Sequence, residues 1–266
     1  MDPLSLGPYR VKAHNTAQAS ENRIHSDAMA RRFGFTGGLV PGVEVYAYMT
    51  HLPVLRWGEA FLAGGWMNCR FASPVYDGDD AVVSASATEE GIAISVESRG
   101  AACASGAAGL LAAPPALPVL PAAAPPLAGQ RPPASEASLA PGTVFATTPE
   151  RMEPAVVAQY LRDIRETSRL FARTGALHPG LVLRACNRLL MENVVLGPWI
   201  HAGSEVRNLG LARVGAQLSA HGVVAVREVR GGHHFVELDV VVSADAAPIA
   251  LVRHVAIWRP RQVGAD

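Results

Sequence analysis

Histidine, cysteine, serine and acidic side chains are the residues of this sequence that could take part in catalysis or bind a metal. The spacing of several of them argues against such roles. Cys69, Cys103 and Cys186 are far apart and outside any C-x-x-C pattern, so neither a disulfide framework nor a zinc site is predicted. His233 and His234 are adjacent, and adjacent residues of a strand point to opposite faces, so they form no metal motif. We therefore expect no metal and no protein-bound cofactor.

Ser168 and Ser204 lack the sharp strand-to-helix turn that exposes a catalytic serine, and Cys186 fits core packing in its helix. Three candidates remain for acid and base chemistry: His25, Asp163 and His178. His25 stands in the polar segment Ser20–Asp27, and in the second half of the chain Asp163 and His178 stand before and at the start of an apolar segment.

The elements that must position these residues recur in the same order in both halves of the chain. In the first half we predict a strand, helical turns, a long helix and three strands: 9–17, 22–33, 42–62, 66–75, 81–88 and 92–102. In the second half we predict a strand, two helices and four strands: 143–148, 154–171, 181–196, 200–216, 221–230, 233–243 and 249–258.

An internal repeat explains this order. Sliding the chain by 138 positions places Phe33 on Phe171, and Pro41-Gly42 on Pro179-Gly180, without a gap. The apolar residues of the two long helices, 42–62 and 181–196, are not confined to one stripe, which indicates burial on most sides. A helix enclosed by a curled antiparallel sheet meets that requirement.

Composition and charge limit the kind of partner. The chain has 266 residues, is 49% hydrophobic, and carries 23 basic and 23 acidic residues with no run of like charge, so a small ligand is expected rather than nucleic acid or a membrane surface. The first twenty residues lack the apolar stretch of a signal peptide, and a cytoplasmic location is expected.

An Ala/Pro-rich segment separates the two halves. The uncharged stretch 100–130 contains six prolines between Pro114 and Pro126, which excludes a membrane helix and favours an extended, semi-rigid linker. We predict an N-terminal domain at 1–111, the linker at 112–141 and a C-terminal domain at 142–266.

Several motifs of the first half resemble the MaoC-like, or (R)-specific enoyl-thioester hydratase, family. They are Ser20-Glu-Asn22-Arg-Ile-His25-Ser-Asp27, then Phe33-Gly-Phe35, then Leu39-Val-Pro41-Gly42 opening the long helix, and finally Arg70-Phe-Ala-Ser-Pro74-Val-Tyr-Asp-Gly78-Asp79. The resemblance implies an α+β fold, a double hot-dog, in which two long central helices are each wrapped by a curved antiparallel sheet. It also implies the hydration or dehydration of acyl groups on coenzyme A or acyl carrier protein.

The family signature D-x-N-P-x-H, followed later by A-H-G, assigns the site. His25 takes the histidine position and Asn22 the asparagine position, whereas Ser20 stands at the acidic residue, Arg23 at the proline and Pro41 at the histidine of A-H-G. His25 then supplies acid or base catalysis, and the Gly42 N–H, beside Val40 and Pro41, polarises the thioester carbonyl. Asp27 or Glu21 could replace the missing carboxylate.

The second half lacks a complete Asp/His pair in the expected positions. The 138-residue offset places Asp163 opposite His25, and it places His178 opposite Val40, just before Pro179-Gly180. If the second half is instead aligned with the family signature in order, Asp163 takes the acidic position and Ser168 the histidine position. Asp163, Glu166 and His178 could form a different constellation, with Gly180 as the counterpart of Gly42.

Three functions follow from these patterns. The first is a hydratase or dehydratase acting on an acyl thioester or a related activated carbonyl compound. The second is a hot-dog thioesterase in which a helix-borne carboxylate such as Asp163 activates water or attacks the thioester. The third is a non-catalytic acyl-binding or scaffolding subunit. Two fused hot-dogs already form a pseudo-dimer, so a monomer or a homodimer is expected.

Overall fold

The computed structural model describes residues 6–18 and 20–261, and its two halves repeat one order of elements. The first half consists of β1 (Tyr9–Lys12), the short helices η1 (Arg23–His25) and α1 (Asp27–Arg32), α2 (Gly42–Trp57), α3 (Glu59–Gly64), β2 (Gly65–Phe71), β3 (Asp80–Ala87), β4 (Ile92–Ser98) and β5 (Ala101–Leu110). The connection between the halves contains the single turn η2 (Ala128–Gln130).

The second half consists of β6 (Val144–Ala146), β7 (Glu150–Arg151), α4 (Pro154–Asp163), α5 (Arg169–Thr174), α6 (Pro179–Asn193), β8 (Ile200–Asn208), β9 (Gln217–Arg230), β10 (His233–Ala244) and β11 (Ala247–Arg259). Long helices α2 and α6 stand at equivalent places, each followed by four strands. The repeated element order predicted from the sequence is confirmed.

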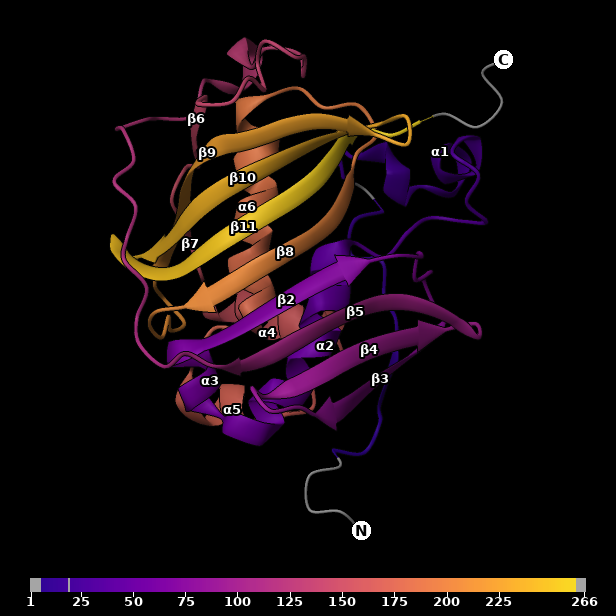
Figure 1. Cartoon of the computed structure of the whole chain (residues 1–266), viewed down its shortest axis with the longest axis vertical. Coiled ribbons are helices and arrows are strands. Elements are labelled where there is room, and N and C mark those ends of the chain that lie inside the picture. The colour runs from indigo at the N-terminus through magenta and orange to yellow at the C-terminus, as the bar shows by residue number, and fades with distance from the viewer. Residues whose placement is uncertain (1–5, 19, 262–266) are drawn as a thin grey trace.

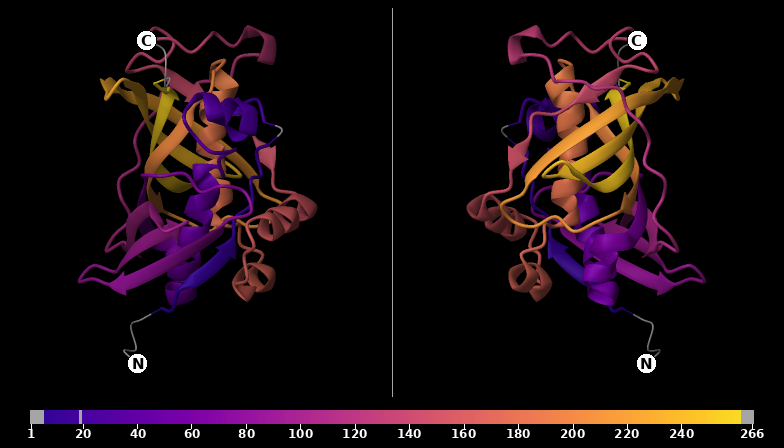
Figure 2. Two further views of the ribbon diagram at one scale, coloured as in Figure 1. Left: turned by 90° about the vertical axis from the view of Figure 1, so that its right-hand side faces the viewer. Right: turned by 90° about the vertical axis from the view of Figure 1, so that its left-hand side faces the viewer.

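One curved antiparallel sheet runs through both halves. Its strand order is β1-β3-β4-β5-β2-β8-β11-β10-β9-β6, with β7 paired to β9. The second five strands repeat the first five in mirrored order, and β2 pairs with β8 at the centre from Trp66 opposite Arg207 to Arg70 opposite Gly203. The sheet wraps α2 and α6, which lie together on its concave side (Figures 1 and 2).

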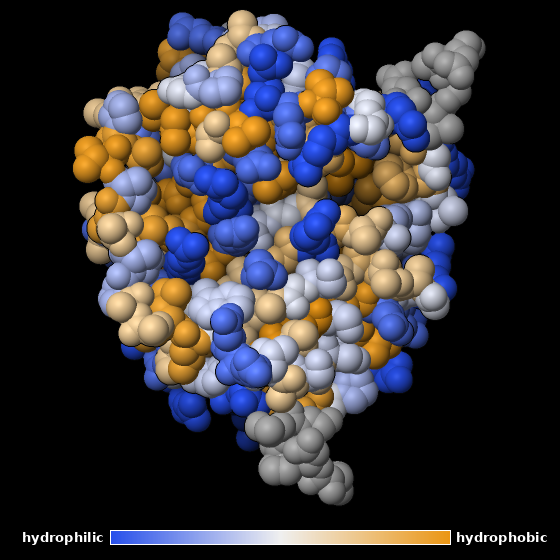
Figure 3. Space-filling view, in the orientation of Figure 1, coloured by the Kyte–Doolittle hydropathy of each residue, from blue (hydrophilic) through white to orange (hydrophobic). Residues whose placement is uncertain are grey.

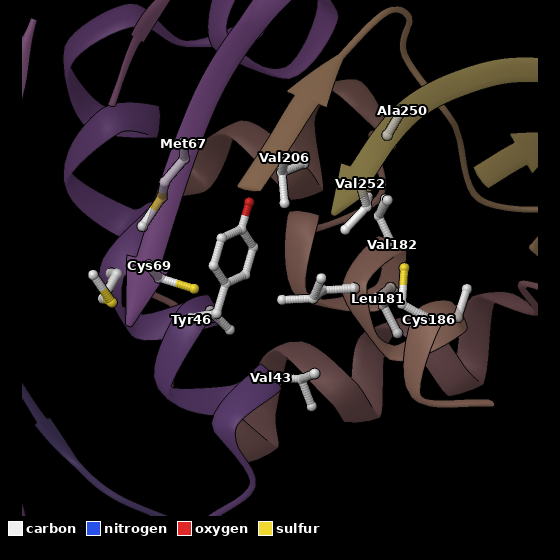
Figure 4. Close-up of a cluster of buried hydrophobic side chains, with 14 of the residues drawn as sticks. Val43, Tyr46, Met67, Cys69, Leu181, Val182, Cys186, Val206, Ala250 and Val252 are labelled. Atoms are coloured by element: carbon white, nitrogen blue, oxygen red, sulfur yellow. The ribbon is translucent and has the colours of Figure 1, made fainter. Parts of the chain in front are cut away.

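The central helices are buried because apolar side chains surround them. In α2 every residue from Val43 to Val54 is buried, including Glu44, and α6 buries both of its ends. Figure 4 shows where the halves meet: side chains of α2 and α6 pack together under β2, β8 and β11, and the cluster includes Val43, Tyr46, Met67, Cys69, Leu181, Val182, Cys186, Val206, Ala250 and Val252.

Turn-forming positions shorten or divide several expected elements. The helix expected over 42–62 breaks at Gly58, whose φ of 58° ends α2 and begins α3. The strand expected over 92–102 is a hairpin, because Arg99 and Gly100 both take positive φ between β4 and β5. The helix expected over 154–171 ends at Asp163, and the strands expected over 9–17 and 200–216 end at Lys12 and Asn208.

The Ala/Pro segment runs over the surface alongside the sheet (Figure 1), and residues 112–130 are almost all exposed or half-exposed. The segment changes character near its end. Val195 and the chain at Pro132–Ala134 exchange two backbone hydrogen bonds, of 2.8 and 2.9 Å, and Leu139 is fully buried. The end of the segment is therefore anchored to the second half at Pro132–Ala134 and at Leu139.

The visible outer face of the sheet mixes hydrophilic and apolar side chains (Figure 3). Among the described residues, no helix is long and apolar enough to cross a membrane.

Candidate functional site

The loop before α2 holds His25 in one orientation. The His25 backbone carbonyl accepts a hydrogen bond of 2.8 Å from the Asn15 amide, and its ring Nδ1 lies 2.7 Å from the Leu39 carbonyl. A carbonyl oxygen only accepts, so Nδ1 carries the hydrogen and Nε2 keeps its lone pair. Burial lowers the pKa of His25, although the hydrogen bond to Leu39 opposes this, and the neutral ring is favoured.

Asn22 joins this loop to the second half of the chain. Its side-chain amide accepts from the Trp199 N–H at 3.2 Å and donates to the Trp199 carbonyl at 2.9 Å. The same Nδ2 lies 3.4 Å from His25 Nε2 and can donate its second hydrogen to the imidazole lone pair in a long, weak bond. Ser20 donates to the Asn22 carbonyl at 3.1 Å. Asn22 and Ser20 therefore position the loop that carries His25.

The N-terminus of α2 is uncapped. Pro41 at the N-cap supplies no side-chain hydrogen bond, and its carbonyl receives only the N–H groups of Glu44 and Val45. The N–H groups of Gly42 and Val43 have no partner within the described part of the chain. Such groups at a helix N-terminus favour a carbonyl oxygen that gains negative charge.

Two cavities meet at His25 and Trp199. We call the first, of about 280 Å³, the inter-helix cavity: it lies between α2 and α6 and its lining includes Ser20, Asn22, Pro41, Glu44 and Arg184. We call the second, of about 220 Å³, the apolar cavity, and it lies beside the start of α2. Its polar side chains are His25, Ser73, His201 and His233, and apolar residues including Val40, Phe71 and Ile257 complete it with the Gly42 backbone.

No carboxylate has taken the place of the missing acidic residue beside His25. The described partners of its ring are Leu39 and Asn22. Asp27 accepts a hydrogen bond of 2.7 Å from the Gly38 N–H, and Glu21 lies 3.3 Å from Arg131. Neither candidate substitute is paired with His25, so the His25 ring has no carboxylate partner among the described residues.

Glu44 is the buried carboxylate of the inter-helix cavity. It is 1% exposed, and its Oε1 accepts from Thr16 at 3.0 Å and from Arg184 Nε at 2.8 Å. Its Oε2 and the buried Tyr160 hydroxyl make no hydrogen bond of ordinary length among the described residues, but the two side chains interact. The pKa of Tyr160 is raised by burial, by the Glu44 charge and by this side-chain interaction with Glu44. A carboxylate two residues after Gly42 was not anticipated from the sequence.

The start of α6, which is equivalent to the start of α2, has its Gly180 N–H already hydrogen-bonded. His178 is fully buried, and its Nδ1 accepts a hydrogen bond of 3.1 Å from the Gly180 N–H, which caps α6. The other ring nitrogen lies 3.4 Å from Glu166, which also contacts His51 at 2.8 Å. Burial opposes ionisation of Glu166, but the hydrogen bonds from His178 and His51 hold its pKa well below the ordinary range.

The structure therefore separates the predicted residues into two groups. His25, Asn22, Ser20, Val40, Pro41 and Gly42 line the two joined cavities. Asp163 lies apart at the end of α4, where it accepts a hydrogen bond of 2.6 Å from Gln159, and His178 and Gly180 bond to each other. His201, Glu44 and Arg184 join the site although no local motif marks them.

Comparisons with known proteins agree with this architecture. No protein-family model matches the chain, and no curated protein is significantly similar to it in sequence. A putative MaoC domain dehydratase from Chloroflexus aurantiacus superposes with a TM-score of 0.63 at 11% identity, over 97% of this chain and 94% of that one.

Two further solved structures match over nearly their whole length. A conserved hypothetical protein from Mycobacterium tuberculosis, described as having a double hot-dog fold, gives a TM-score of 0.61 at 15% identity, over 94% of this chain and 95% of that one. An N-terminal dehydratase from the difficidin assembly line gives a TM-score of 0.54 at 12% identity, over 96% of this chain and 94% of that one. With its mirrored strand order and two enclosed helices, this chain has the double hot-dog fold.

Proposed function

We propose that the protein is a hydratase or dehydratase of acyl thioesters that interconverts a 2-enoyl and a 3-hydroxyacyl group. The observation that carries the proposal is the position of His25, whose Nε2 keeps a lone pair in a cavity wall that continues to the uncapped start of α2. The dehydratase descriptions of two of the compared structures are consistent with it.

The reaction needs one proton-transferring group and one group that stabilises negative charge. The thioester carbonyl would accept hydrogen bonds from the Gly42 and Val43 N–H groups, which withdraw electrons from the double bond. Water adds to Cβ, His25 Nε2 takes the proton that the water loses, and the same imidazolium returns a proton to Cα. A single base completes this cycle, which fits a His25 that has no carboxylate partner.

The cavities suggest how a carried substrate would lie. With the thioester at the junction near His25, the acyl chain would enter the apolar cavity, and the pantetheine arm of coenzyme A or acyl carrier protein would follow the inter-helix cavity. No further cofactor is needed for this reaction.

The test is incubation with 2-enoyl and 3-hydroxyacyl thioesters of N-acetylcysteamine and coenzyme A, followed by mass spectrometry and a free-thiol assay. We expect the gain or loss of one water molecule without thiol release. Release of free thiol would instead favour a thioesterase, and binding that raises the melting temperature without turnover would favour an acyl-binding subunit.

One observation keeps the thioesterase as a second candidate. Glu44 is a helix-borne carboxylate with one unpaired oxygen in the same cavity as His25. If it activates water, Glu44→Gln should remove thiol release and leave water addition intact. The Arg184 guanidinium is hydrogen-bonded to the other oxygen of Glu44, which favours a structural role.

A further inference from the structure

His201 belongs to the second half of the chain, but it lies against the start of α2 in the first half. It stands near the beginning of β8, before the pairing of β8 with β2 begins, and only 5% of it is exposed. Its ring packs edge-on against Phe71, with centroids 4.9 Å apart. A Cβ atom added at Gly42 would lie 2.9 Å from His201 Nδ1, so the missing side chain of Gly42 leaves room for this ring.

The hydrogen bonds of His201 determine which ring nitrogen is unprotonated. Its Nε2 lies 3.1 Å from the Gly203 carbonyl and 2.9 Å from Ser204 Oγ. Because the carbonyl only accepts, Nε2 carries the hydrogen. Ser204 in turn lies 3.0 Å from His254 Nδ1 and can donate its hydroxyl hydrogen there. His201 Nδ1 is therefore an unprotonated acceptor, and the contacts of Nε2 with Gly203 and Ser204 fix the orientation of the ring.

This acceptor has no partner inside the described part of the protein. Nδ1 is buried and makes no hydrogen bond, while the ring lines the apolar cavity together with His25 and Gly42. Leaving a buried acceptor unpaired costs free energy, because it has lost its bonds to water without gaining others. A ligand group that donates a hydrogen bond at this point would remove that cost.

We propose that His201 Nδ1 binds the hydroxyl group of the 3-hydroxyacyl thioester, or the water molecule that adds to the enoyl thioester. This inference rests on the proposed function and adds a second residue that contacts the reacting atoms. A hydroxyl bound in this way donates its hydrogen to His201 and keeps its oxygen lone pairs for a proton from His25, which lines the same cavity.

The two histidines then divide the work of dehydration. His25 Nε2 removes the Cα proton, the electron pair forms the double bond, and the bond from Cβ to oxygen breaks. The departing hydroxyl takes the proton back from His25 and leaves as water, while His201 keeps it oriented throughout. His201 exchanges no proton, so His25 alone accounts for every proton that is transferred in the reaction.

The experiment compares the binding of 3-hydroxybutanoyl and butanoyl thioesters of N-acetylcysteamine, which differ only in that hydroxyl. Wild-type protein should bind the hydroxylated ligand about 3- to 10-fold more tightly, the ordinary size of one hydrogen bond. His201→Gln can keep the bonds to Gly203 and Ser204 but loses the acceptor at Nδ1. It should bind both ligands with the affinity that wild type has for the butanoyl ligand.

His201→Asn is the matched variant, because its amide oxygen reaches the Nδ1 position, and it should retain part of the preference. Should His201→Gln fail to fold, histidine ¹⁵N spectra of the wild-type protein replace it: the Nδ1 resonance of His201 should move with the hydroxylated ligand and stay with the butanoyl ligand. Equal wild-type affinity for the two ligands, or a preference that survives in His201→Gln, would overturn the assignment. A preference that His201→Gln removes, in a protein that makes no enoyl product, would support the assignment while refuting the proposed reaction.

Discussion

At the residue scale, the proposed site depends on a histidine that has no carboxylate partner among the described residues. In this chain the polar contacts of the His25 ring come from a backbone carbonyl and an amide, both uncharged. Such partners orient an imidazole and select its tautomer, but they do not stabilise an imidazolium as a carboxylate does. We therefore expect slower proton transfer than in a protein with the complete pair.

The first prediction is that His25→Asn reduces turnover by roughly 10²-fold or more, the usual size of a general acid or base contribution. The amide of the new asparagine can still donate to the Leu39 carbonyl, so the loop should keep its conformation and the melting temperature should change little. Initial rates and thermal melts check this. The matched control is His14→Asn, since His14 contacts Asp77 outside both cavities. Unchanged turnover in the His25 variant would show that the ring serves only to hold the loop.

At the element scale, the starts of the two long helices differ although the halves share one order of elements. The start of α2 leaves its N–H groups free, whereas His178 caps α6 through the Gly180 N–H. The buried cluster of His51, Glu166 and His178 fills the second position with hydrogen-bonded side chains. Only the first half therefore keeps a helix start that a carbonyl group can reach.

The second prediction compares Gly42→Ala with Gly180→Ala. At Gly42 the added methyl would lie 3.0 Å from the Phe71 ring and 2.9 Å from His201, so it should lower turnover at least 10-fold, while the better helix propensity of alanine offsets much of the stability loss. At Gly180 it would overlap the Tyr160 hydroxyl at 1.9 Å, and we expect a loss of about 1 to 3 kcal/mol in unfolding free energy. Urea titrations and rate measurements on both variants check this; equal effects on rate and stability would contradict it.

The third prediction concerns the connection between the halves. Replacing Pro114–Pro126 with a Gly/Ser segment of equal length should change the unfolding free energy only slightly, because these residues bury little surface. Leu139→Ala should cost about 2 to 5 kcal/mol, because this side chain is fully buried. Denaturant titrations of the two variants give the comparison. A large loss from the Gly/Ser replacement would mean that residues 114–126 are bound to the sheet.

At the scale of the whole molecule, the continuous sheet makes the two halves one folding unit. Strands β2 and β8 share hydrogen bonds at the centre of the sheet, and α2 and α6 pack beneath it. Separation of the halves would expose both strand edges and the apolar sides of both helices. The site belongs to this joined unit, because His25 comes from one half and His201 from the other.

The fourth prediction is that the fold loses stability as the pH falls below about 6.5. Burial lowers the pKa of His254 to about 3 and lowers the pKa of His201 well below its ordinary value. Between the folded and unfolded pKa values the unfolded chain binds more protons, so acidification favours unfolding. For His254 the effect is about 2 kcal/mol at pH 5, and His201 acts in the same direction. The melting temperature should fall by roughly 4 °C or more between pH 7.5 and pH 5.

His254→Asn isolates this effect, because its amide oxygen can still accept from Ser204 but does not titrate. The variant should lose less of its melting temperature over the same range. Glu166 does not interfere, since stability linked to its lowered pKa is lost only below pH 4.5. An equal fall in the variant and the wild type would exclude His254 as a source of the acid sensitivity.

The sequence by itself determined the repeated elements, the enclosed helices and the position of His25, because these depend on short-range patterns. The proline-glycine helix starts and the apolar residues around each helix lie within one segment, and their spacing predicts local structure directly. The hairpin at Arg99-Gly100 and the break at Gly58 were missed, because they depend on backbone angles that sequence patterns specify only weakly.

Only the tertiary structure decided which residues share the site. His201 is 176 positions from His25 and lies in the site because β8 pairs with β2, whereas Asp163 is on the surface because α4 ends there. The choice between Gly42 and Gly180 also required coordinates, since both follow a proline and only the neighbouring side chains show which N–H is already bonded. Contacts between distant segments leave no periodic pattern in the chain, and they are set by packing.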